Sequence, residues 1–394
     1  EIAIDHRQSP HQISADYGDV QDRKLLDYLQ TTGQQLVAHT HRVHMPYRFH
    51  CVNAIYVNAY AFPGGTIACT RGILLDLESE AELAALLGHE LGHVNARHTA
   101  ASMSKAQAAN MAVGGLAILT SATMGSGLGS LAGQLGMLGS GALLATYSRD
   151  NERQADGLGM QYMTQGGYGP QGMVGLMDML NSMDQHQPGI TDLLFATHPM
   201  SSERHQKSVN QADTDFRQYK GQPLYRERYM DHTAGLRKIK PAVEKMQAGQ
   251  KALATEQFDQ AQAMFKQALK LVPDDYTGLL LMAKCQLIRK KAVEAGRYAA
   301  QAKQVYPGEA QAYHISGVAN LRTQQYEAAY EDFSQSERHL PGNPNTVFFR
   351  GLALEGMQKR EPAAQAYLAF LKQVQQGEQA QYAYQRLREW GYVN

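Results

Sequence analysis

The sequence contains few cysteines, a single tryptophan and no excess of charge of either sign. Lys and Arg total 37, Asp and Glu also total 37, and no polybasic run occurs, so nucleic acid is not expected as a partner. No CxxC pair occurs among the three cysteines, which excludes a cysteine zinc site and a thioredoxin-type motif. Uninterrupted apolar runs as long as a membrane-spanning helix requires are also absent.

Neither the cysteines nor the start of the chain decides in which cellular compartment the protein acts. Cys51 and Cys69 flank two predicted neighbouring strands, so they could form a disulfide in an oxidising compartment or stay free in a reducing one. The chain starts at Glu1 without an initiator Met or an apolar leader. A mature form whose signal peptide has been removed would start in this way, as would a chain begun at an arbitrary residue.

One predicted helix carries the residue pattern of a zinc site. Ser79 and Glu82 form a capping box that predicts the start of this helix. His89 and His93 are four residues apart, about 40° round the helix axis, so both imidazoles project from one face. Two zinc ligands need this geometry, and Glu90 beside them can reach a metal-bound water. The pattern indicates a zinc metalloprotease, and a structural histidine pair is the alternative.

Strands are predicted before this helix, at residues 47–52, 54–58 and 66–70, with a Pro-Gly-Gly turn ahead of the last one. An edge strand next to a metal helix can pair with an extended substrate backbone. The residues expected to do so are Asn58, Ala59, Tyr60 and Ala61. An ordinary hairpin is compatible with the same residues, so both interpretations stay open.

Residues 106–146 consist mainly of Ala, Gly, Ser, Leu and Met and carry almost no charge. Small residues let helices approach closely, so a tight helical hairpin is predicted here. Its glycines interrupt each apolar run well short of a bilayer crossing. A buried or lid-like hairpin is favoured, and peripheral contact with a membrane is the alternative.

A polar helix is predicted from about residue 147 to 163. Glu152 and Asp156 are four residues apart and share a face, which Arg149 adjoins. A carboxylate from a second helix would complete a His-His-Glu zinc site. Asp156, with Arg149 beside it, would then accept the free imidazole N–H of a ligand histidine. Further along, His198 in a predicted loop could contact the oxyanion, add a ligand, or be an ordinary loop histidine.

Three motifs in this order resemble the Ste24/HtpX-type zinc metallopeptidases: residues 58–65, His89 to His93, and Ser148-Arg149 with Glu152, Ala155 and Asp156. The similarity covers about residues 16–210. Within the family it is to the soluble, BepA-like bacterial branch, which carries a C-terminal tetratricopeptide (TPR) tail.

The resemblance implies a gluzincin site. One zinc ion per chain would be bound by His89, His93 and Glu152, and Glu90 would be the catalytic base. His198 would line the site, either as a catalytic residue or as a regulatory fourth ligand. One departure is Gln154, which stands where the family usually has Glu and is expected to point away from the metal.

The second half of the chain repeats every 34 residues from about residue 240. Three columns of residues recur at this interval: Pro273, Pro307 and Pro341; Gly249, Ala283, Gly317 and Gly351; Ala261, Ala295, Ala329 and Ala363. These are the turn and close-packing positions of TPR helix pairs. About four repeats should stack into a solenoid whose concave groove binds peptides or partner proteins. A packing extension of the first domain is the alternative.

Together these patterns predict a mainly α fold with a small β-sheet. A zincin-type α+β metalloprotease domain is expected at residues 1–210, a connector at 211–240 and an all-α TPR solenoid at 241–394. The expected function is hydrolysis of peptide bonds in unfolded or misassembled polypeptides by a zinc-bound water, with the repeats recruiting clients or protein partners. By resemblance, this points to protein quality control in the periplasm or cell envelope of a Gram-negative bacterium. The alternative is a latent or non-proteolytic, chaperone-like TPR binding scaffold.

Overall fold

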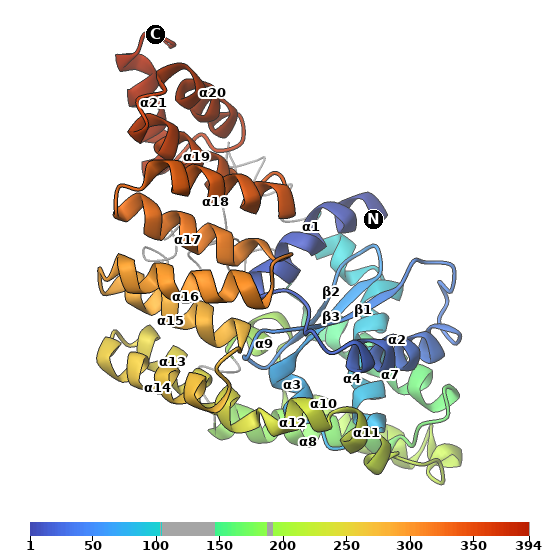
Figure 1. Cartoon of the computed structure of the whole chain (residues 1–394). Helices are drawn as coiled ribbons and strands as arrows, with labels where there is room; N and C mark the ends of the chain where they lie inside the picture. Colours follow the sequence, from blue (N-terminus) through green and yellow to red (C-terminus); the bar gives the residue numbers. More distant parts are fainter. Residues whose placement is uncertain (103, 105–145, 187–191, 394) are drawn as a thin grey trace. The chain divides into compact units, whose positions relative to one another are not determined.

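The computed structural model of the chain describes all residues except 103, 105–145, 187–191 and 394 (Figure 1). The described residues form two compact units, the first within residues 1–106 and 143–243 and the second within 244–394. The Gly-rich hairpin predicted at 106–146 lies almost entirely outside the described residues, so its contact with a membrane stays a prediction. In the part of the chain that is described, no helix is long and apolar enough to cross a membrane.

The first unit combines a three-stranded sheet with helices from both ends of its sequence. In chain order its elements are α1 (Ile2–Ala15), α2 (Arg23–Val37), β1 (Arg48–Val52), β2 (Ala59–Ala61), β3 (Thr66–Thr70), α3 (Arg71–Asp76), α4 (Glu80–Asn95), α7 (Arg149–Gln165), α8 (Gln171–His186), α9 (Asp192–Thr197), α10 (Ser202–Asp213), the 3₁₀ helix Arg217–Tyr219, α11 (Arg226–His232) and α12 (Ala234–Lys238).

The sheet has the order β1-β3-β2, with β1 parallel and β2 antiparallel to the central β3. The strand predicted at residues 54–58 is wrong, because the edge strand is Ala59–Ala61. The hydroxyl of Thr70 accepts the N–H of Asn58 at 3.1 Å and donates to the carbonyl of Tyr56 at 2.6 Å. These backbone groups are therefore bonded to a side chain instead of to a neighbouring strand. Cys51 and Cys69 are paired in register on β1 and β3, and both are buried free thiols.

Helices α4 and α7 touch through their backbones. A Cβ atom added to Gly88 would lie 3.0 Å from the carbonyl oxygen of Gly159, and one added to Gly92 would lie 2.9 Å from that of Ala155. Only residues without a side chain permit this approach on α4. The two glycines share one helix face, and His89 and His93 each directly follow one of them, so the close contact brings the histidines of α4 next to the carboxylates of α7.

The segment predicted as a connector, residues 211–240, packs within the first unit. The hydroxyl of the fully buried Tyr229 donates to the carbonyl of Leu74 at 2.6 Å. Arg228 forms an ion pair with Glu80 at the start of α4. The domain boundaries expected from the sequence, at residues 210 and 240, stay a prediction.

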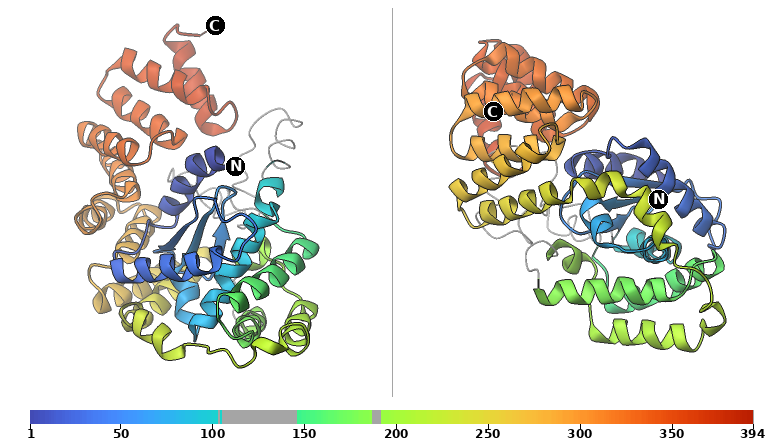
Figure 2. Two further views of the ribbon diagram at one scale, coloured as in Figure 1. Left: turned by 90° about the vertical axis from the view of Figure 1, so that its right-hand side faces the viewer. Right: turned by 60° about the horizontal axis from the view of Figure 1, so that its bottom comes forward.

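The second unit is a series of antiparallel helix pairs that follow one another along the chain (Figure 2). Its helices are α13 (Lys240–Ala254), α14 (Phe258–Leu271), α15 (Tyr276–Ile288), α16 (Ala292–Val305), α17 (Ala310–Arg322), α18 (Tyr326–His339), α19 (Pro344–Gly356), α20 (Arg360–Leu371) and α21 (Glu378–Glu389). The predicted fold class, mainly α with a small sheet followed by an all-α repeat, is confirmed.

Within the helix pairs of the repeat, a small residue on one helix faces a residue of matching size on the other. A Cβ atom on Gly317 would lie 2.8 Å from the ring of Phe333, and Gly249 and Gly351 face the rings of Phe265 and Tyr367 in the same way. The second repeat has Ala283 and Ala299 at these two positions, and both are fully buried. A larger residue on one helix is thus matched by a smaller one on its partner, which keeps the helices close-packed.

The turn inside each helix pair also recurs. Glu256, Lys290, Gln324 and Gln358 are 34 residues apart and have φ between 58° and 61°. Non-glycine residues adopt this left-handed conformation at some cost, so each turn depends on the packing of the helices that it joins.

The α4–α7 contact predicts opposite effects for two glycine substitutions. We expect Gly92→Ala to lower the free energy of unfolding of the metal-free protein by about 1–3 kcal/mol, because it pushes α4 away from α7. Gly157→Ala is the control on α7, where an added Cβ meets no described atom within 4 Å. It should raise the same free energy by about 0.5–1 kcal/mol through helix propensity. Urea denaturation followed by circular dichroism measures both, and equal effects would contradict the close contact.

Candidate metal centre

Helix α4 holds three of the predicted site residues in buried positions. As the sequence predicts, the Ser79 hydroxyl caps the helix and accepts the N–H of Glu82 at 3.2 Å. His89, Glu90 and His93 are 5%, 1% and 0% exposed. Three polar side chains in an apolar interior need partners, because an unpaired buried polar group is costly.

The partners form a cluster in which four side chains direct one atom each at a common point: His89, His93, Glu152 and His198. His89 Nε2 lies 3.1 Å from His93 Nε2 and 3.4 Å from His198 Nδ1. Glu152 Oε1 lies 3.2 Å from both His93 Nε2 and His198 Nδ1. Ligand atoms bound to zinc at about 2.0–2.1 Å in a tetrahedron are about 3.3–3.4 Å apart. The cluster therefore fits zinc in both the kind and the spacing of its atoms.

The surroundings hold these groups in the protonation states that a metal ligand needs. Burial lowers the pKa of His93 well below its ordinary value, which favours the neutral imidazole. Burial alone would raise the pKa of Glu152, but His198 and His89 outweigh it and hold that pKa well below its usual range. A neutral imidazole and an ionised carboxylate both present free lone pairs.

Asp156, predicted to accept the N–H of a ligand histidine, lies behind the cluster with Oδ1 2.9 Å from His89 Nδ1. The residue beside it is Arg204 of α10. Its guanidinium donates two hydrogen bonds of 2.8 Å to the Asp156 carboxylate, and its Nη1 lies 2.7 Å from Glu152 Oε2. Arg149, predicted for this place, is instead exposed at the first residue of α7. Nothing in the local sequence pattern indicated Arg204, since it is 48 residues from its partner.

His93 has a second histidine partner, which the spacing of the sequence does not indicate. His98 Nδ1 lies 3.1 Å from His93 Nδ1, and His98 Nε2 lies 3.0 Å from Gln154 Oε1. On a continuous helix, residues five apart would lie about 140° apart round the axis. Here α4 ends at Asn95, and Arg97 adopts φ of 60°, which turns the chain so that His98 faces back.

The spacing of the sequence does not indicate Tyr147 either. Its ring stacks on that of His93, with centroids 3.7 Å apart and planes inclined by 24°. Its hydroxyl lies 3.0 Å from that of Thr99, and its N–H donates to the carbonyl of Thr197 at 3.1 Å. The ring thus covers one face of a predicted ligand, and the backbone of Tyr147 is bonded to the residue that precedes His198.

Glu90 is next to the cluster and does not belong to it. Its Oε1 lies 3.8 Å from His198 Nε2, and its buried Oε2 has no hydrogen-bond partner among the residues that the structure describes. Burial raises the pKa of Glu90, an effect that His198 and His89 partly oppose. A buried carboxylate with a free oxygen beside a metal cluster is suited to exchanging a proton with a reacting group.

The predicted substrate-binding residues lie on or next to the edge strand β2. Ala59, Tyr60 and Ala61 are all buried, and the Tyr60 hydroxyl donates to Asp16 Oδ2 at 2.6 Å. The side chain of Asn58 is fully buried, and within the described part of the chain neither of its polar atoms has a hydrogen-bond partner. Strand β2 contacts α4, but its role in binding substrate stays a prediction.

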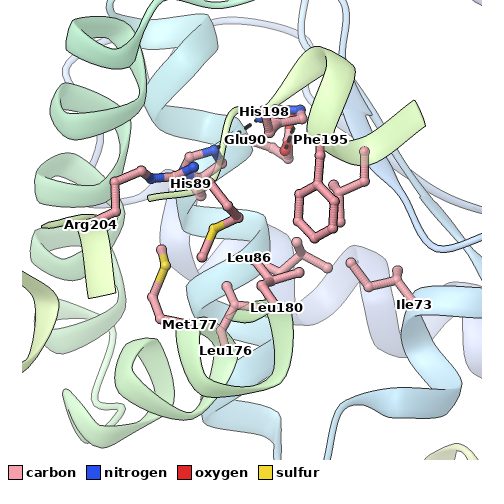
Figure 3. A pocket seen from close by; sticks show the side chains of 12 residues that line it. Ile73, Leu86, His89, Glu90, Leu176, Met177, Leu180, Phe195, His198 and Arg204 are labelled. Atoms are coloured by element: carbon pink, nitrogen blue, oxygen red, sulfur yellow. Dashed lines mark hydrogen bonds and ion pairs between the residues drawn. The ribbon is translucent and has the colours of Figure 1, made fainter. Parts of the chain in front are cut away.

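An apolar pocket adjoins the cluster. His89, Glu90, His198 and Arg204 line it on one side. Side chains from α4, α8 and α9 line the other, among them Leu86, Leu176, Met177, Leu180 and Phe195 (Figure 3). Phe195 and Met200 are half-buried, whereas most of the remaining lining is buried. The pocket therefore presents an apolar surface directly beside Glu90.

Comparison with known proteins confirms the family resemblance, since residues 24–211 match peptidase family M48. Over 198 residues the chain is 31% identical to the beta-barrel assembly-enhancing protease of Yersinia pestis. The aligned segment covers 49% of this chain and 40% of that protein. It is 37% identical over 150 residues to the metalloprotease YcaL of Escherichia coli (strain K12). This alignment covers 38% of this chain and 56% of YcaL.

A third relative extends further into the repeats. The chain is 28% identical over 285 residues to a putative beta-barrel assembly-enhancing protease of Vibrio cholerae, which covers 65% of this chain and 57% of that protein. The chain thus spans about half the length of the curated relatives that it matches.

The two arginines near Asp156 predict a clear contrast in stability. Arg204→Met leaves two buried carboxylates without their cation, so we expect the free energy of unfolding of the metal-free protein to fall by about 3–5 kcal/mol. Arg149→Met removes an exposed side chain, and it should change that free energy by less than about 0.5 kcal/mol. Urea denaturation in the presence of a chelator measures both. A larger effect at Arg149 would restore the assignment made from the sequence.

Proposed function

Because residues 24–211 belong to peptidase family M48, we propose that the chain is a zinc-dependent endopeptidase in which His89, His93 and Glu152 hold the metal ion. The observation that carries the proposal is the convergence of these three side chains, spaced for a tetrahedral ion, beside a buried glutamate with a free oxygen. When bound, zinc would supply a Lewis acid for a substrate carbonyl and make a water molecule nucleophilic near neutral pH.

The chain's own residues do the proton transfers and the positioning. Glu90 takes a proton from the attacking water at Oε2 and gives it to the nitrogen of the leaving amine. Asp156 Oδ1 lies 2.9 Å from His89 Nδ1, so a proton on Nδ1 faces the carboxylate and Nε2 stays free to act as a ligand. Arg204 favours the ionised form of Asp156 and at the same time contacts the carboxylate of Glu152.

His198 supports a second candidate, a latent enzyme. Its Nδ1 lies in the fourth position of the cluster, 3.4 Å from His89 Nε2 and 3.2 Å from Glu152 Oε1. In that position it competes with the attacking water for a place among the ligands. Rotated away, the same ring can donate a hydrogen bond to the substrate oxyanion. The latent or non-proteolytic binding scaffold is therefore the alternative to a constitutively active protease.

The substrates and partners follow from the relatives and the repeats. We propose that the repeat unit recruits client polypeptides or protein partners through its helix pairs. Two of the relatives are named for assembly of β-barrels and come from Yersinia pestis and Vibrio cholerae. By analogy, the clients are misassembled β-barrel proteins, and the protein acts in quality control in the periplasm or cell envelope of a Gram-negative bacterium.

The proposed function predicts that metal binding and proteolysis can be separated. Wild type and Glu90→Gln should each bind one zinc ion, but only wild type should cleave casein, with a loss of at least about 100-fold in the variant. Glu227→Gln, an exposed residue of α11, is the control and should match wild type. Zinc is measured by atomic absorption and cleavage by gel electrophoresis.

The outcomes separate the two candidates. Zinc in both proteins with cleavage by neither would favour the latent enzyme, and His198→Ala should then release activity. Absence of zinc from wild type would refute the metal site itself.

The apolar pocket predicts a cleavage preference. Glu90 delivers its proton to the leaving amine, so the side chain on that amine's residue is the one nearest the pocket. We expect peptides with Leu or Phe there to be cleaved at least about tenfold more efficiently than peptides with Asp or Gly. Phe195→Ala should reduce this preference, whereas Leu193→Ala, a half-buried neighbour outside the pocket lining, should not. Mapping of cleavage sites in casein by mass spectrometry would contradict the assignment if no apolar preference appears.

A further inference from the structure

The two predicted ligand histidines differ in what holds their second ring nitrogen. His89 Nδ1 faces the carboxylate of Asp156 at 2.9 Å, and that carboxylate is bound by Arg204. His93 Nδ1 faces His98 at 3.1 Å, and His98 faces the side-chain amide of Gln154 at 3.0 Å. One histidine is thus held by a charged pair and the other by a neutral chain of two side chains.

We propose that His98 and Gln154 are positioning residues that fix the orientation and tautomer of His93, and that this relay sets how tightly the site holds zinc. The proposal rests on the zinc site of the proposed function and goes beyond it, because the family resemblance assigns no role to His98. It also corrects the sequence expectation for Gln154, which reaches back to the site through His98.

Hydrogen-bond chemistry allows only one direction for the relay when metal is bound. A histidine that binds zinc through Nε2 carries its proton on Nδ1. His93 Nδ1 must then donate to His98 Nδ1, which leaves His98 Nε2 as the protonated nitrogen. That nitrogen can donate only to an acceptor, and the oxygen Oε1 of Gln154 lies 3.0 Å away.

The reverse direction would prevent metal binding. If the amide nitrogen of Gln154 donated to His98 Nε2, the proton of His98 would sit on Nδ1 and point at His93. His93 would then accept at Nδ1 and carry its own proton on Nε2, the atom that faces the other ligands. The orientation of one surface amide is therefore linked to the tautomer of a fully buried ligand.

The fold holds the relay in place from three sides. Arg97 in its left-handed conformation ends α4 and directs His98 towards His93. Tyr147 stacks on the face of the His93 ring and restricts its rotation. His98 is 6% exposed, so the relay is shielded from water except at Gln154.

A neutral end to the relay has a measurable consequence. Where a carboxylate ends such a chain, it pulls on the imidazole proton and makes the ligating nitrogen more basic, which strengthens metal binding. Gln154 offers an oxygen without the negative charge. It orients His93 but adds little to its basicity, so the zinc affinity of this chain lies below the maximum that the site could reach.

Zinc affinity of the full-length protein, measured by competition with a chromophoric chelator, tests the relay. We expect Gln154→Glu to tighten zinc binding, by about threefold or more, and Gln154→Leu to weaken it. His98→Leu should weaken it about 10- to 100-fold. Gln165→Glu adds the same charge at an exposed position of α7, about 16 Å along the helix, and should leave the affinity unchanged.

A double variant shows whether the effect passes through His98. In the His98→Leu background, Gln154→Glu should no longer tighten zinc binding. Gln154 is exposed, so its variants are expected to fold even if His98→Leu does not. The unfolding of the metal-free Gln154 variants should match wild type, which distinguishes positioning of a ligand from a general structural role.

Results that would overturn the relay alone differ from the result that would also overturn the proposed function. Equal affinities for wild type and both Gln154 variants, or equal tightening by Gln165→Glu, would overturn the relay and leave the protease proposal standing. Tightening by Gln154→Glu without His98 would also overturn it. A wild-type protein that binds no zinc would overturn the proposed function and the relay together.

Discussion

The close contact between α4 and α7 is the constraint on which the rest of the first unit depends. Gly88 and Gly92 meet the backbone at Gly159 and Ala155 at distances that leave no room for a Cβ on α4. At that separation the histidines of one helix and the glutamate of the other can reach a common point. The zinc motif on α4 would supply only two ligands if the helices were held further apart by side chains, as most packed helices are.

Bringing these side chains together places several charges in the protein interior, away from bulk solvent. Glu152, Asp156 and Arg204 are all nearly fully buried, and such an arrangement stabilises a protein less than apolar packing would. Its value is chemical, because it fixes protonation states and ring orientations before any metal arrives. The two ligand histidines are held by different means, His89 by a buried ion pair and His93 by a neutral relay.

In the repeat unit, too, small residues allow helices to pack closely against each other. Small residues face aromatic rings in three of the repeats, and the second repeat has alanine on both sides. The left-handed turn recurs at Glu256, Lys290, Gln324 and Gln358, although none of these is glycine. Local strain of this kind persists only where neighbouring helices hold the turn, as they do in a stack of similar units.

The sequence by itself determined the features that depend on local spacing. The cap at Ser79, the pairing of His89 with His93, the shared face of Glu152 and Asp156, and the 34-residue period could all be read from it, because helix geometry makes residue spacing equivalent to direction. Only the tertiary structure decided which distant groups meet. Arg204 replaced Arg149 beside Asp156, His98 met His93 through a left-handed turn, and the side chain of Thr70 moved the edge strand to Ala59–Ala61. Such pairings depend on how the chain turns between elements, and spacing along one helix or strand carries no information about that.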